Sequence, residues 1–151
     1  MNKLLSILFI LILAFSCLAE TPAEPNPPSD MELAENALPL LSALVSSSAF
    51  TSFEEEVPFS LYQCVYSALE LDAETPLFLL PCAEETDQDA PAELLNREIT
   101  IEDAYEIGGG EVKVTLVVYL DGEFEMYCDV YLVYMQDSLY TSVISSAFIA
   151  E

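Results

Sequence analysis

Histidine and tryptophan are both absent from the 151 residues of the sequence, and glycine occurs only four times. Without histidine the chain cannot build Ser-His-Asp or Cys-His catalytic arrangements, and it lacks the commonest general base near neutral pH. Three of the glycines lie together at 108–110, between two expected strands and without a following lysine or helix start. They predict a turn and not a phosphate-binding loop. No cofactor is expected.

Positive charge is also scarce, with three Lys and Arg residues against 27 Asp and Glu residues. After residue 30 there are 24 acidic residues and two basic ones, Arg97 and Lys113, which give a formal net charge of −22. Such a surface repels nucleic-acid phosphates and anionic lipid headgroups. Nucleic acid is therefore not expected as a partner. A basic protein partner, divalent cations or solubility alone would each account for the acidity.

The first 19 residues have the layout of a secretory signal peptide. Lys3 supplies a positive charge, and an apolar run from Leu4 to Phe15 follows that only Ser6 interrupts. This run is shorter than the roughly 20 apolar residues that a membrane span requires, and small residues follow it. We therefore expect residues 1–19 to direct export, so that the protein is extracytoplasmic and touches a membrane only through its signal or a lipid anchor.

Two ways of processing this signal agree with the residues at its end. Residues 13–17, LAFSC, resemble a bacterial lipobox in which Cys17 becomes the lipidated first residue, although Phe15 is larger than usual. Alternatively, residues 17–19 resemble a small-x-small signal peptidase site with cleavage after Ala19, which would release a secreted or periplasmic chain. The lipobox is the main expectation, because residues 18–30 are proline-rich and favour an extended tether between membrane and domain.

Helical spacing of apolar residues covers 31–45 and about 58–71. Ser29 and Glu32 have the spacing of a capping box at the start of the first helix, and Pro39 predicts a kink or break within it. Serines at 46–48 end this helix. In the second helix, an aromatic stripe that includes Tyr62 and Tyr66 is expected to face the core.

Four segments of alternating hydrophobicity, at 99–107, 112–120, 124–134 and 139–149, predict an antiparallel meander. Asp121-Gly122 between the second and third segments is a strong hairpin signal. For the first segment, a short helix that ends at Gly108 is an alternative. Residues 31–151 are thus predicted to be a single acidic α+β domain, in which two amino-terminal helices pack on one face of a three- to four-stranded antiparallel meander sheet.

The two sides of this sheet have different expected roles. Tyr62, Tyr66, Tyr105 and Phe124 are expected on the helix side, where they either pack as core or line a pocket between helices and sheet. The other side of the third strand is acidic at one end and apolar towards Val133. Part of the sheet is therefore either covered on both faces or exposes an apolar patch to a partner.

Three cysteines lie within the domain: Cys64, Cys82 and Cys128. Export permits disulfides, and three thiols permit one bridge with three possible pairings. Cys64 in a helix and Cys128 in a strand both have apolar neighbours, so they are either bridged to each other or buried as small hydrophobic side chains. Their spacing matches no zinc site.

Carboxylates are the only acid-base groups available. Glu102, Asp103 and Glu106 could supply a pair, as could Glu123 and Glu125, but exposed acids in so acidic a chain are nearly always a solvated face. No catalytic residue is therefore predicted, and the residues leave the question of an enzyme open while favouring a non-enzymatic protein. An acidic loop is a weak candidate for a hard cation such as calcium, although it lacks the spacing and the glycine of the twelve-residue calcium loop. Its candidate ligands are Glu84, Glu85, Asp87 and Asp89.

The order of the predicted elements resembles the cystatin-like cone of the nuclear transport factor two-like superfamily. The resemblance is carried mainly by EVKVTLVVYLDGEFEMYCDVYLVYMQDSLYTSVI at 111–144, with its strand, Asp-Gly turn, strand, polar turn and final aromatic strand. Tyr140 stands where small lipoproteins of that superfamily usually have tryptophan, and the break at Pro39 is a second departure. The superfamily contains both enzymes and binding modules, so the resemblance implies a fold and leaves the function open.

Three functions agree with these features. The first is a membrane-tethered, non-enzymatic binding or accessory protein with a protein or small-molecule partner, for which the acidic surface favours a basic one. The second is a small-molecule-binding or enzymatic cone domain that uses a pocket between helices and sheet. The third is a calcium-responsive acidic surface protein.

Overall fold

The computed structural model describes residues 28–86, 89–135 and 138–147. The predicted signal peptide, Cys17 and most of the tether lie outside these residues, as does Asp87 of the acidic loop. Within the described residues the chain forms three helices followed by four strands. These are α2 (Asp30–Asn36), α3 (Leu38–Ser46), α4 (Phe59–Ala68), β1 (Arg97–Gly108), β2 (Glu111–Leu120), β3 (Glu123–Met135) and β4 (Ser138–Ala147).

The helices begin and end where local sequence signals place them. The Ser29 side chain caps α2 and accepts a hydrogen bond from the backbone N–H of Glu32 at 3.3 Å. Pro39 lies in the first turn of α3, where its missing N–H removes no helical hydrogen bond. The predicted break is therefore confirmed, and it divides the first expected helix into α2 and α3 at Ala37. The second expected helix is α4.

The strands pair in sequence order, β1-β2-β3-β4, and every neighbouring pair is antiparallel. Asp121 and Gly122, with φ angles of 52° and 85°, form the tight turn of the β2–β3 hairpin. The segment 97–108 is a strand, so the helical alternative for it is wrong. The predicted α+β class and the antiparallel meander are confirmed.

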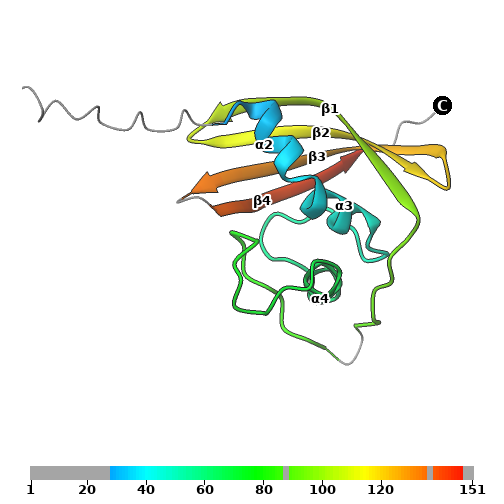
Figure 1. Ribbon diagram of the computed structural model, residues 1–151. Helices are drawn as coiled ribbons and strands as arrows, with labels where there is room; N and C mark the ends of the chain where they lie inside the picture. The colour runs from blue at the N-terminus through cyan, green and yellow to red at the C-terminus, as the bar shows by residue number, and fades with distance from the viewer. Residues whose placement is uncertain (1–27, 87–88, 136–137, 148–151) are drawn as a thin grey trace, which may run out of the picture.

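One face of this sheet carries the hydrophobic core. Figure 1 shows α2 and α3 running across that face, with α4 beyond them. Along β2 and β3, fully buried residues alternate strictly with partly exposed ones, which is the pattern of a sheet covered on one side. The buried positions on these strands are Val112, Val114, Leu116, Val118, Met126, Cys128, Val130 and Leu132.

The outer edge of β4 is partly covered by two loops. Phe53 donates its backbone N–H to the carbonyl of Ile144 at 3.2 Å, and Leu79 donates to the carbonyl of Thr141 at 3.0 Å. Such coverage protects an edge strand from pairing with another chain. It also accounts for the apolar run at 77–80, which is a loop packed against the sheet. No helix among the described residues is long and apolar enough to cross a membrane.

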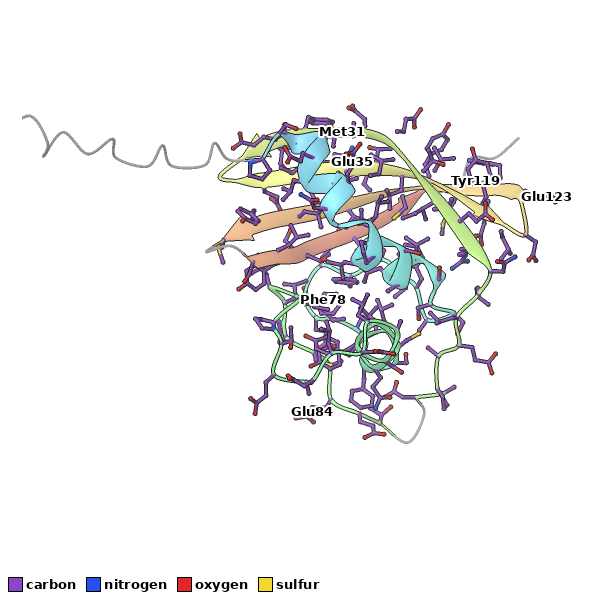
Figure 2. All side chains as sticks on the ribbon, in the orientation of Figure 1. Met31, Glu35, Phe78, Glu84, Tyr119 and Glu123 are labelled. Atoms are coloured by element: carbon purple, nitrogen blue, oxygen red, sulfur yellow. The ribbon has the colours of Figure 1, made fainter. Side chains whose placement is uncertain are left out.

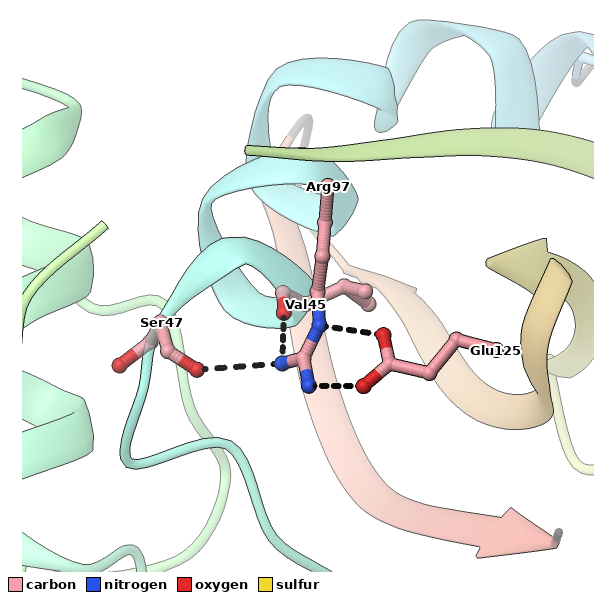
Figure 3. A network of polar contacts seen from close by, with 4 residues as sticks. All are labelled: Val45, Ser47, Arg97 and Glu125. Carbon is pink, nitrogen blue, oxygen red and sulfur yellow. Dashed lines mark hydrogen bonds and ion pairs between the residues drawn. The ribbon is translucent and has the colours of Figure 1, made fainter. Parts of the chain in front are cut away.

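Arg97 joins the sheet to the end of α3 (Figure 3). Its Nε and Nη2 donate to Oε2 and Oε1 of Glu125 on β3 at 2.6 and 2.5 Å. Its Nη1 donates to the carbonyl oxygens of Val45 and Ser47 at 2.9 and 3.5 Å. The last carbonyls of a helix have no partner within the helix, so this guanidinium satisfies groups that would otherwise need water. Its Cζ atom also lies 6.0 Å from the ring centre of Phe50.

Replacement of Arg97 by methionine is expected to lower the free energy of unfolding by about 2 kcal/mol, because the partly buried Glu125 carboxylate loses a bidentate partner. Lys113→Met is the matched control. It breaks the more exposed Lys113–Asp129 pair, for which a loss of about 0.5 kcal/mol is expected. Urea denaturation of both variants measures the difference. Equal losses would show that Arg97 has no special part in stability.

Candidate binding surface

The structure brings Tyr62 and Tyr66 together in a packed aromatic cluster between α4 and the loop that follows it. Their rings stack with centres 4.1 Å apart, and Phe78 packs against both at 6.2 and 6.4 Å. The hydroxyl of Tyr62 donates to the carbonyl of Ala73 at 3.1 Å, and that of Tyr66 donates to the carbonyl of Thr75. Ring faces and hydroxyls are therefore occupied by the chain itself.

The other two candidate pocket residues, Tyr105 and Phe124, lie on the opposite side of the sheet. When β1 and β3 are paired with β2, one residue of each strand has no opposite residue on β2. These residues are Glu102 in β1 and Glu125 in β3. Each extra residue is a β-bulge, which shifts the in-out alternation of the following side chains by one position. Tyr105 pairs with Lys113 and Phe124 pairs with Tyr119, both away from the helices. The structure thus does not gather the four residues into one pocket.

Cys64, Cys82 and Cys128 are free thiols in this structure. Cys64 and Cys128 are buried, and Cys128 belongs to the main hydrophobic core. Burial raises the pKa of the Cys128 thiol to about 12, with a smaller contribution from the neighbouring Asp129. Burial, followed by the charge of Glu56, also raises the pKa of the Cys82 thiol. Because the thiolate is the reactive form, burial makes Cys82 and Cys128 poor nucleophiles.

The candidate cation ligands do not converge on one point within the described residues. Glu84 and Glu85 are exposed, and a carboxylate oxygen of Asp89 accepts hydrogen bonds from the backbone N–H and the hydroxyl of Thr86 at 2.6 and 3.0 Å. Asp87 lies outside the described part of the chain. Among the described residues there is no group of three or more side chains arranged to hold a metal ion.

The side of the sheet turned away from the helices carries most of the tyrosines. We call it the helix-free face, and its side chains follow from the register of the four strands. Five of the eight tyrosines of the sequence project from it, together with one phenylalanine and four carboxylates. These residues are Tyr105, Tyr119, Phe124, Tyr127, Tyr131, Tyr140, Glu98, Asp103, Glu111 and Asp129.

Neighbouring rings on this face touch one another. The centre of the Phe124 ring lies 6.5 Å from that of Tyr119 and 5.4 Å from that of Tyr127. Phe124 and Tyr105 are 45% and 44% exposed, so the rings form an accessible surface that the described helices leave uncovered. Regular alternation along the third strand predicts Tyr127 and Tyr131 on this side, but it does not predict Tyr105 and Phe124 there, because the bulges have no clear local signal.

One basic side chain of the protein itself, that of Lys113, lies within the helix-free face. The ammonium of Lys113 lies 2.9 Å from a carboxylate oxygen of Asp129 and 5.9 Å from the ring centre of Tyr105. The Thr115 hydroxyl donates to the other oxygen of the same carboxylate at 2.9 Å. The hydrogen bond to Asp129, and secondarily its charge, raises the pKa of Lys113 above the ordinary value. The face therefore combines a carboxylate and a ring around one positive charge.

Among the described residues, two hollows that open on the helix side are large enough to consider as binding sites. The larger, about 370 Å³, lies between α3, α4 and the segment before β1, and its walls include Pro39, Ala43, Leu69 and Leu94. The smaller, about 190 Å³, lies at the rim between the start of α2 and the ends of β1–β3. Asp30, Glu106 and Tyr134 line the smaller one. Leu41 and Leu116, two fully buried leucines of the core, line neither hollow.

Tyr66 gives the aromatic cluster a testable dependence on pH. Burial, followed by its interaction with Tyr62, raises the pKa of Tyr66 from 10.0 to about 12. The folded state therefore favours the neutral phenol, and this stabilisation is complete below pH 10. We expect it to be lost as the pH rises towards 12, by roughly 2–3 kcal/mol.

Tyr66→Phe is expected to lose about 1 kcal/mol of stability at neutral pH, because the hydrogen bond to Thr75 disappears. Its stability should then fall less than that of the wild type between pH 10 and 12. Tyr105→Phe, which removes a hydroxyl from an exposed ring, is the control. Chemical denaturation across this pH range would contradict the account if the wild type and Tyr66→Phe lost stability in parallel.

No protein-family model matches the chain, and no curated protein or solved structure matches it either. The resemblance to the nuclear transport factor two-like superfamily stays a prediction, because it depends on the order and spacing of the strands alone. On the helix-free face, aromatic rings and carboxylates lie side by side, and none of the described helices covers them.

Proposed function

We propose that this protein is an exported, membrane-tethered, non-enzymatic binding or accessory protein, and that the helix-free face of the sheet is its binding surface. The observation that carries the proposal is the set of uncovered rings on that face. Clustered tyrosine side chains supply large, rigid contact area at low entropic cost and still offer a hydroxyl for hydrogen bonding.

Both basic residues of the domain have structural partners, which favours binding over catalysis. Arg97 is held by Glu125 and by the end of α3, and Lys113 is held by Asp129. Neither the guanidinium nor the ammonium is then free to stabilise an anionic transition state, and only backbone N–H groups and neutral side chains would remain for that task.

The tether fits this function in length and position. The first described helix begins at Asp30, the last residue of the proline-rich segment 18–30. In an extended polyproline conformation residues 18–29 would span about 37 Å. A chain lipidated at Cys17 would thus hold the domain clear of the membrane surface while it binds a partner there.

A second candidate is the binding of a small molecule by a cone-like domain. The rim hollow between α2 and the strand ends favours it, because Asp30 and Glu106 both line a space of about 190 Å³. The hollow is small, and both carboxylates already accept a hydrogen bond. Asp30 accepts one from the backbone N–H of Glu106 at 2.9 Å, and the Glu106 side chain accepts one from the backbone N–H of Gly110 at 3.3 Å. The helix-free face is therefore the stronger candidate.

The intact mass of protein expressed in a bacterial host with its own signal tests the export and the anchor. We expect a mature chain that begins at Cys17, carries acyl mass and sediments with membranes. Cys17→Ser should abolish the added mass and the membrane association, whereas Cys82→Ser, the matched control, should change neither. A wild-type chain that begins at Glu20 without lipid would contradict the tether. Masses before and after reduction and alkylation also report any bridge among the domain cysteines.

A further inference from the structure

We propose that the helix-free face docks an arginine-rich segment of a partner protein. This inference rests on the proposed binding function and names the chemistry of its partner. Its starting point is the pairing of carboxylates with rings. Glu98 lies directly across from Tyr119, and Asp103 precedes Tyr105 by two residues on the same face. Asp129 stands between two further tyrosines of its own strand, at 127 and 131.

The chain itself uses such a pairing to hold a cation. On this face Lys113 is bound by the Asp129 carboxylate and lies beside the Tyr105 ring. On the helix side Arg97 is bound by the Glu125 carboxylate and lies over the Phe50 ring. Glu98 and Tyr119 occupy directly opposite positions of β1 and β2 on the same face, so a carboxylate and a ring lie next to each other there without a basic residue of the chain between them. A cation supplied by another molecule would complete that arrangement.

Arginine fits these positions better than lysine does. Its planar guanidinium stacks on aromatic rings and donates two parallel hydrogen bonds to one carboxylate, whereas the lysine ammonium is a compact and strongly hydrated charge. In an extended segment with arginine at every second position, all arginine side chains lie on the same face of the segment. Their spacing then matches that of Asp103 and Tyr105, which are two residues apart in sequence.

Charge separates this partner from other occupants of the face. A second copy of the domain would bring its own net charge of −22, and the basic residues it carries are already in ion pairs. Phosphate-rich polymers are repelled by the same charge. A positively charged protein segment is instead attracted over a distance and then held by the rings at contact.

Binding of fluorescent peptides to the purified exported chain tests the proposal. One peptide alternates arginine and threonine, a second lysine and threonine, and a third glutamate and threonine. We expect the arginine peptide to bind, the lysine peptide to bind roughly fivefold more weakly, and the glutamate peptide not to bind.

Two doubly substituted variants with the same change in net charge locate the site. Glu98→Gln with Asp103→Asn removes two carboxylates from the helix-free face, and binding of the arginine peptide is expected to weaken about tenfold. Glu84→Gln with Glu85→Gln removes two exposed carboxylates from the acidic loop. Figure 2 shows Glu84 well away from Tyr119, so this control is expected to weaken binding less than twofold. Thermal unfolding confirms that both variants fold.

Each other outcome overturns the proposal in a recognisable way. Equal weakening by both variants would mean that net charge alone attracts the peptide. Equal affinity for the arginine and lysine peptides would remove the role of the rings. Concentration-dependent dimerisation that the Glu98 and Asp103 substitutions alter would make a second copy the occupant. Failure of all peptides to bind a lipidated, membrane-associated chain would reject the arginine-rich partner and leave the proposed tethered function standing.

Discussion

The guanidinium of Arg97 connects three parts of the chain that are distant in sequence: the start of β1, the bulge of β3 and the end of α3. Its bidentate contact with Glu125 requires that carboxylate to point towards the helices. Strict alternation along β3 would place Glu125 on the opposite side, so the contact is possible because Glu125 is the extra residue of a bulge. The same bulge turns Phe124 onto the helix-free face. One ion pair thus links the helix packing to the composition of the far surface.

The two faces of the sheet therefore differ in composition. The helix side is packed with buried aliphatic residues and carries the stability of the domain. The helix-free face has tyrosines and carboxylates instead. Most of these side chains are partly buried, since neighbouring side chains on the same face cover part of each one. An aromatic surface of this kind on a monomer usually marks an interaction site. The proposed binding function therefore predicts that substitutions on this face change recognition without disturbing the core.

Local signals in the sequence predicted the elements and their order. The Ser29 cap, the helix break at Pro39 and the Asp121-Gly122 turn each depend on a few adjacent residues, whose conformational preferences are visible without tertiary context. The antiparallel meander followed from the alternation and the short turns. These features were sufficient for the α+β class and for the helices on one side of the sheet.

The assignment of side chains to faces was less predictable. Glu102 and Glu125 are ordinary strand residues in sequence, and only the pairing with β2 identifies them as bulges. The bulge at Glu102 reverses the alternation of the residues after it, and the bulge at Glu125 reverses that of the residues before it. Tyr105 and Phe124 were therefore expected on the helix side but lie on the other side of the sheet. The aromatic cluster of Tyr66 also depends on a loop that returns to α4, a tertiary contact without a periodic signal.

The most direct test of the helix-free face as a binding surface is the chemical nitration of tyrosines in purified protein and in intact cell envelopes. Tyr105 and Tyr134 provide a matched pair, because they are 44% and 42% exposed but lie on opposite sides of the sheet. A partner docked on the helix-free face predicts that Tyr105 is protected in the envelope while Tyr134 reacts as it does in the purified chain. Equal reactivity of Tyr105 in both preparations, or protection of Tyr134 alone, would contradict the account.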